Sequence, residues 1–192
     1  DRMCGELKKE YGQLLEEAVA FHGHKCAGIE SGTRMTMCAL KRLGITDPKG
    51  ADSKKLIVFV EVDRCATDAI AALTGCRPGK RTMKVLDYGK MAATFVNLES
   101  GKAVRLASTF GNKNGLEDNA APPDFATAAD EDLFVIQDVA MVLRPEDLPG
   151  KPVHKAVCAC CGEKVMDGRE VEREGQTYCK PCAAGETYYQ PV

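Results

Sequence analysis

The chain has 192 residues, of which 44% are hydrophobic and 28% are charged, and its formal net charge at pH 7 is −2. This composition is typical of a globular protein with one core of ordinary size, alone or with a small added module. The charge gives no electrostatic reason to expect a nucleic acid or an acidic membrane surface as partner. The longest apolar run, residues 56–60, is too short to span a bilayer, and no signal segment opens the chain. We therefore expect a soluble, cytoplasmic protein.

Helices are predicted in the first part of the chain. Apolar residues recur at helical spacing over residues 7–22, 29–43 and 67–75. Gly23 and Gly44 follow the first two segments as natural helix stops. On the first helix His22 shares the stripe of the apolar residues, so its side chain is expected to point inward.

Strands are predicted in the middle of the chain. Residues 54–62 are β-branched and aromatic, which is typical of a buried strand. An antiparallel meander is expected from three alternating segments separated by glycine-containing turns, residues 82–89, 90–98 and 102–109. Residues 111–129 are expected to form a loop. Residues 130–143 are interpreted as a helical turn that leads into a strand, with a continuous helix as the alternative.

A linker with three prolines, residues 144–152, is the best domain boundary in the sequence. We therefore expect a core domain over residues 1–149 and a small second domain over residues 150–192. Helices that precede most of the strands favour an α+β core, in which the N-terminal helices pack on a mainly antiparallel sheet.

Ten cysteines are the unusual feature of the composition, and their spacing favours metal binding in a reducing interior over a disulfide framework. Two Cys-x2-Cys pairs, separated by 17 residues, suit a tetrahedral zinc site with the ligands Cys158, Cys161, Cys179 and Cys182. Four such ligands leave no open position, so we expect a structural site. Disulfides or idle thiols are the alternative. Cys160 or His154 could take part only with less regular geometry.

A second candidate site lies in FHGHKCAGIESGTR, residues 21–34. If the backbone leaves the helix at Gly23 and is extended, His22, His24 and Cys26 face the same side and can ligate a transition metal. Taken alone, the stretch slightly favours a simpler interpretation, in which the histidines pack or cap a helix end and the thiol is buried.

Other cysteines shift the balance from this simpler interpretation towards a metal site. Cys65 directly follows the buried strand, and Cys76 ends the next helix, so a fourth ligand is available. Cys38 lies within a helical stripe and is better interpreted as a small core residue. Four charged residues are candidates for supporting contacts or, more simply, for solvated surface positions: Arg34, Asp63, Asp68 and Lys90.

Three segments, FHGHKCAGIESGTRM, EVDRCATDAIAALTGCRPGK and VLDYGKMAATF, resemble the E-subunit family of formylmethanofuran dehydrogenase over residues 15–142. The resemblance rests on the histidine–glycine–histidine–x–cysteine signature and on the blocks that follow it in the same order. Ala27 stands where the family has proline, which softens the loop but leaves every candidate ligand in place. The C-terminal cysteines resemble the treble-clef-type zinc finger that some members carry.

The resemblance implies an α+β core with a second metal, expected to be zinc, near His22, His24, Cys26 and Cys65. It also implies a homodimer in a cytoplasmic setting. The implied partner is formylmethanofuran dehydrogenase, a molybdenum or tungsten enzyme of one-carbon metabolism. The sequence does not decide which of the two histidines is the ligand.

Two functions remain open at this point. The slightly favoured one is a metal-binding accessory or scaffold protein that associates with such a complex and docks through its zinc finger. The alternative is a metal-dependent enzyme that uses the core His/Cys site, where the metal would activate water or where Cys26 or Cys65 would act as a nucleophile or redox thiol. The accessory role is preferred because no complete set of acid, base and nucleophile can be identified.

Overall fold

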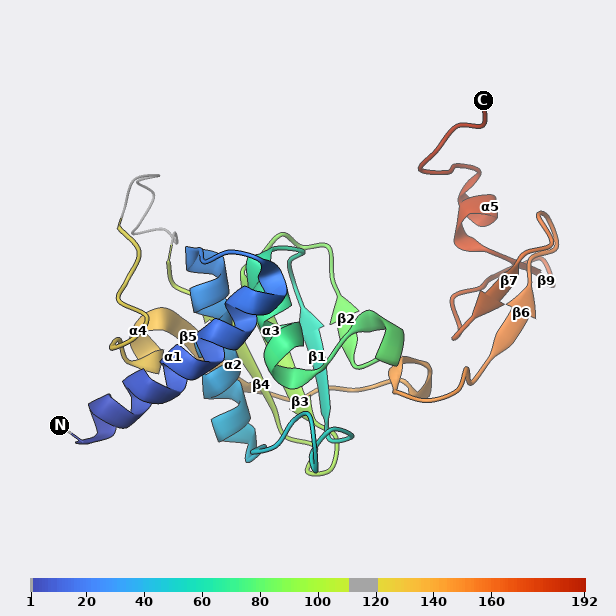
Figure 1. Ribbon diagram of the computed structural model, residues 1–192. Helices are drawn as coiled ribbons and strands as arrows, with labels where there is room; N and C mark the ends of the chain where they lie inside the picture. Colours follow the sequence, from blue (N-terminus) through green and yellow to red (C-terminus); the bar gives the residue numbers. More distant parts are fainter. Residues whose placement is uncertain (1, 111–120) are drawn as a thin grey trace. The chain divides into compact units, whose positions relative to one another are not determined.

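The structure is a computed structural model, which describes residues 2–110 and 121–192. The chain divides into two compact units, Asp1–Met141 and Val142–Val192 (Figure 1). The linker of residues 144–152 belongs to the second unit in this division. The domain boundary at 149/150 stays a prediction. Within the described residues, no helix is both long and apolar enough to cross a membrane.

The first unit combines helices with one mixed sheet, so the predicted α+β class is confirmed. Its helices are α1 Arg2–His22, α2 Ala27–Leu43, α3 Cys65–Thr74 and the short α4 Asp130–Leu133. Its five strands stand in the order β2 Met83–Val85, β1 Leu56–Val60, β3 Ala92–Asn97, β4 Ala103–Ser108 and β5 Phe134–Val139. Helices α1 to α3 lie together over the sheet in Figure 1.

The helix ends and the last strand agree with the sequence analysis. Gly23 and Gly44 both have positive φ, 105° and 67°, which a side chain disfavours and glycine permits. The helical turn followed by a strand, predicted over residues 130–143, is found as α4 and β5. Of the loop predicted over residues 111–129, residues 111–120 lie outside the described part, and the remainder contains turns.

The predicted meander is correct only for its later part. Strands β3, β4 and β5 are consecutive and antiparallel, but β2 pairs in parallel with β1, with Val58 opposite Met83. The reason is α3, which follows β1 and carries the chain back along the sheet, so that β2 runs in the direction of β1. The alternation of apolar and polar residues along 82–89 is the same in a parallel and in an antiparallel strand. It therefore could not show that β2 pairs in parallel.

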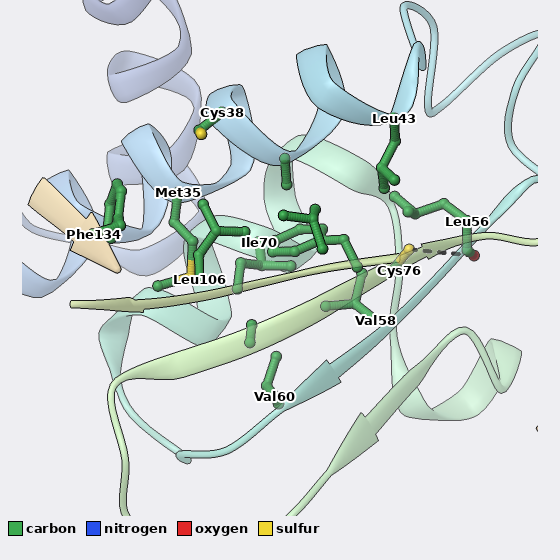
Figure 2. Close-up of a cluster of buried hydrophobic side chains, with 14 of the residues drawn as sticks. Met35, Cys38, Leu43, Leu56, Val58, Val60, Ile70, Cys76, Leu106 and Phe134 are labelled. Atoms are coloured by element: carbon green, nitrogen blue, oxygen red, sulfur yellow. Dashed lines mark hydrogen bonds between the residues drawn. The ribbon is translucent and has the colours of Figure 1, made fainter. Parts of the chain in front are cut away.

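The main core lies between the helices and the sheet, as Figure 2 shows for side chains such as Met35, Val58 and Leu106. Two cysteines belong to it. Cys38 is 2% exposed, in agreement with its interpretation as a core residue. Cys76 is 3% exposed, and its thiol donates to the carbonyl of Leu56 at 3.8 Å. This placement explains Cys76 as a packed residue and removes it from the candidate ligands.

Helices α2 and α3 approach so closely that the contact point has no room for a side chain. A Cβ atom on Gly32 would lie 2.7 Å from the Cα and the carbonyl oxygen of Ala66 and 2.8 Å from the Cβ of Ala69. The obstructing atoms are mostly backbone, which cannot move without displacing a helix. Gly32 therefore sets the distance between the two helices.

Replacing Gly32 by alanine should lower the free energy of unfolding by about 1–3 kcal/mol, because overpacking outweighs the gain in helix propensity. The matched control is Gly12→Ala on α1, where a Cβ atom would meet nothing within 4 Å. That variant should instead gain about 0.5–1 kcal/mol. Urea denaturation followed by helical circular dichroism measures both. Equal shifts of the two variants in the same direction would contradict the steric argument.

The second unit is built from two hairpins and a short helix. The first hairpin pairs β6 Lys155–Val157 with β7 Lys164–Met166, and the second pairs β8 Val171–Arg173 with β9 Gln176–Tyr178. Helix α5 Lys180–Ala184 follows. The linker is tied to this unit, because Arg169 donates to Asp147 at 2.7 Å. A cysteine-bearing turn, a hairpin and a helix in this order form the predicted treble-clef-type finger.

Candidate metal sites

The four C-terminal cysteines come together in the second unit. Cys158 and Cys161 lie in the turn between β6 and β7, while Cys179 caps α5 and Cys182 lies in its first turn. Their sulfur atoms are within 4.8 Å of one another. The backbone fixes this arrangement, because the amide of Ala159 donates to the Thr177 carbonyl at 2.8 Å and so joins the turn to β9.

The electrostatics of this cluster favour a bound cation. Backbone amides, that of Cys161 first, lower the pKa of the Cys158 thiol to about 6. The pKa of Cys182 is raised instead, mainly by its hydrogen bond to Cys179 and then by burial. Several thiolates this close repel one another, and a divalent metal removes the repulsion. Four sulfur donors complete a tetrahedron, so a zinc here has a structural role.

The second cluster joins three helices of the first unit. His22 ends α1, Cys26 is the N-cap of α2, and Cys65 is the first residue of α3. One ligand atom from each lies within 4.8 Å of the other two. All three residues are partly exposed. The structure therefore brings together three of the four residues that the sequence analysis proposed for the core site.

His22 is held in a defined orientation. Its Nδ1 atom lies 2.8 Å from a carboxylate oxygen of Asp68, and its side chain is 15% exposed. Its Nε2 atom is buried and has no hydrogen-bond partner within the part of the chain that the structure describes. A buried polar atom without a partner is costly, and a metal ion would satisfy it. The residues present therefore fit a metal.

The two thiols are placed at helix starts, where the helix dipole favours negative charge. The sulfur of Cys26 accepts from the amide of Ile29 at 3.4 Å. Burial, followed by the hydrogen bond to Cys26, raises the pKa of Cys65. Gly28 allows α2 to lie close to Cys65, since a Cβ atom there would lie 3.0 Å from the Cβ of Cys65. Nitrogen and sulfur donors of this kind suit zinc.

His24 lies next to this cluster rather than in it. Its ring is exposed, and its centroid is 4.7 Å from that of His22 with the planes tilted by 34°. His22 offers a ring nitrogen within 4.8 Å of the two sulfur atoms, and its Nε2 atom has no partner among the described residues. The cluster thus contains His22 and not His24, and His22 is the better candidate of the two, a choice that the sequence left open.

The four charged residues singled out from the sequence have different roles. Asp68 contacts His22, so it supports the cluster. Asp63 and Lys90 are exposed, as expected of solvated charges. Arg34 is 1% exposed and binds the segment around Asp130, so it is neither a surface charge nor a contact of the cluster. The sequence analysis named Asp68 only as one of these four candidates, and the spacing Cys-x2-Asp at a helix start, which puts Cys65 and Asp68 on one face, is the signal that could have singled it out.

Two models of known protein families match the chain. A family model described as FmdE, molybdenum formylmethanofuran dehydrogenase operon, matches residues 21–132, and a model of the prokaryotic dksA/traR C4-type zinc finger matches residues 152–188. The first match includes all three residues of the core cluster, and the second includes all four C-terminal cysteines.

Two individual proteins are similar to the chain. A probable S-adenosyl-L-methionine-binding protein of Archaeoglobus fulgidus is 36% identical over 95 residues, which are 49% of this chain and 26% of that protein. The chain thus spans about a quarter of the length of that relative. The crystal structure of a tungsten formylmethanofuran dehydrogenase FmdE-like protein from Syntrophus aciditrophicus matches with a TM-score of 0.58 and 22% identity, over 93% of this chain and 95% of that one.

The structural match shows that the two proteins share a fold. The zinc-finger match and the four gathered cysteines support zinc at the C-terminus and a metal-binding role. Because the FmdE model covers more than half of the residues, the chain belongs to the FmdE family and carries a C4-type zinc finger after the family domain.

Proposed function

We propose that the protein is a metal-binding accessory or scaffold protein of a molybdenum- or tungsten-dependent formylmethanofuran dehydrogenase-like complex of one-carbon metabolism. In this proposal the core domain holds a second zinc through His22, Cys26 and Cys65. The observation that carries it is the convergence of these three donors from three helices. Family membership supports the association with the complex.

The two sites would then have different tasks. The Cys4 site is closed by four protein ligands and organises a finger that serves as a docking surface. The core site offers three protein donors and is partly exposed, which leaves one coordination position for an exchangeable ligand. Such a position suits a protein that carries, senses or transfers a ligand within a larger assembly.

A metal-dependent enzyme is the second candidate, and the three-donor arrangement is the observation that favours it. A bound zinc with an open position supplies a Lewis acid or an activated water. The chain's own contribution would be to hold His22 and the two thiols in place. Both candidates need an accessible fourth position, and cobalt-loaded protein tests it, since a small ligand such as formate would shift the visible spectrum only if that position is open. A spectrum that no ligand shifts would contradict the enzyme candidate and the exchangeable position of the accessory protein alike. Chloride at equal ionic strength is the control.

Metal analysis of the full-length protein tests the core site. The parent should contain two equivalents of zinc, and the double variant Cys26→Ala/Cys65→Ala should contain one. The ligand set has no other thiol within the cluster to replace those removed. Zinc content by mass spectrometry, together with circular dichroism to confirm folding, gives the result.

The matched control for this experiment is Cys38→Ala, which removes a thiol from the same domain but from the packed core. It should retain both zinc ions even if it is less stable. Two equivalents in the Cys26→Ala/Cys65→Ala protein would refute the core site. A homodimer is also expected, and light scattering of the full chain would measure it.

A further inference from the structure

The contact between His22 and Asp68 joins the end of α1 to the first turn of α3. We propose that Asp68 is the positioning residue of the core metal site: it holds the imidazole proton of His22 on Nδ1 and thereby presents Nε2 to the metal. This inference rests on the proposed core site. It concerns a residue that the proposed ligand set does not include.

A neutral imidazole carries one proton, and the nitrogen without it is the one that can bind a metal. Nδ1 lies 2.8 Å from the Asp68 carboxylate, which can only accept, so the proton belongs on Nδ1. Nε2 then has a free lone pair, and it is this atom that is buried without a partner in the described residues.

The position of Asp68 in α3 ties it to the proposed ligand Cys65 as well as to His22. Cys65 and Asp68 are three residues apart in α3, so they share one face of its first turn. One short segment thus supplies a ligand directly and fixes a second ligand from another helix. A carboxylate that receives the outer proton of a ligating histidine also makes the ring a better donor.

The size of the expected effect follows from exposure. Removing such a partner typically weakens metal binding by about 10–100-fold. The side chain of Asp68 is 48% exposed, and water screens part of its charge. We therefore expect the lower end of this range, a loss of about tenfold in zinc affinity for Asp68→Ala.

Asp68 also lies where a carboxylate stabilises its helix, and the experiment must separate this effect from the positioning of His22. A carboxylate in the first turn of a helix stabilises it through the helix dipole, whether or not a metal binds. Glu30 occupies the corresponding turn of α2, where it accepts from Tyr11 rather than from a histidine. Glu30→Gln is therefore the matched control, and it should leave zinc affinity unchanged.

The test uses the full-length protein and two readouts. Competition with a chromophoric chelator measures zinc affinity of the core site, while nitrogen NMR of labelled histidine reports which ring nitrogen of His22 carries the proton in zinc-free protein. Asp68→Ala should lose about tenfold in affinity and show a mixture of ring tautomers. Asp68→Asn, which keeps an acceptor oxygen, should retain the Nδ1 proton and lose less affinity.

The outcomes distinguish this inference from the proposed function. If Cys26→Ala loses one zinc but Asp68→Ala binds as tightly as the parent with an unchanged tautomer, only the role of Asp68 is overturned. If Cys26→Ala retains both zinc ions, the core site is wrong and the positioning role falls with it. A loss of affinity in Glu30→Gln equal to that in Asp68→Ala would assign the effect to the helix dipole.

Discussion

Replacing Cys179 and Cys182 together by alanine is expected to remove one zinc and to unfold the finger, while the first unit stays folded. Of the described residues in the second unit, Cys158 is the one hydrophobic side chain that is buried. The finger therefore has almost no apolar core to stabilise it. Zinc binding in such modules contributes about 10–16 kcal/mol, far more than its short hairpins can supply alone.

Hydrogen exchange with mass spectrometry, read separately for the two units, measures this result. Amides of β6 to β9 should lose their protection in the double variant, whereas those of β1 to β5 should not. Cys160→Ala is the matched control, because it removes the neighbouring exposed thiol and leaves all four gathered cysteines. A double variant whose finger remains protected would show that zinc is not what folds it.

All four cysteines of the Cys4 site could be predicted, because the spacing that identifies them lies within short segments of the sequence. Each Cys-x2-Cys pair fits one turn, and the intervening 17 residues suffice for the hairpin that brings the pairs together. The core site depends on three helix ends that are far apart in the sequence. Its residues could be nominated from the sequence, but their convergence follows from the packing of α1, α2 and α3.

The choice between His22 and His24 shows what the sequence lacked. The alternation of residues 22, 24 and 26 suggested one extended stretch, yet His22 is still helical and Gly23 turns the chain. His22 was correctly expected to point inward, because that expectation used the helical stripe. The partner that it meets, Asp68, comes from another helix, and no local pattern pairs the two.

In the fold, too, the features with local signals were predictable and those that depend on distant segments were not. Helix ends and buried strands were predicted because glycine stops and apolar periodicity are local signals. The parallel pairing of β2 was missed because strand direction depends on where α3 returns the chain. Arg34 was missed as a buried residue, since the groups that compensate its charge lie some 90 residues later in the chain.

Arg34 is the basis of the second large expected effect. Its guanidinium donates to the carbonyls of Phe125 and Ala128 and to the carboxylate of Asp130, at 2.9 Å for the last. The side chain is 1% exposed. Replacing Arg34 by methionine keeps much of the volume but leaves two carbonyls and a carboxylate without their donor. We expect the free energy of unfolding to fall by about 3–5 kcal/mol.

Urea denaturation followed at 222 nm measures this loss, because the longest helices belong to the first unit. Asp130→Asn is the control: it keeps an oxygen that can accept from Arg34 and should cost about 1 kcal/mol. The double variant Arg34→Met/Asp130→Ala should be less destabilised than the sum of its single variants, because the two groups share one interaction. A loss below about 1 kcal/mol in Arg34→Met would contradict the view that this arginine anchors the segment before β5 to α2.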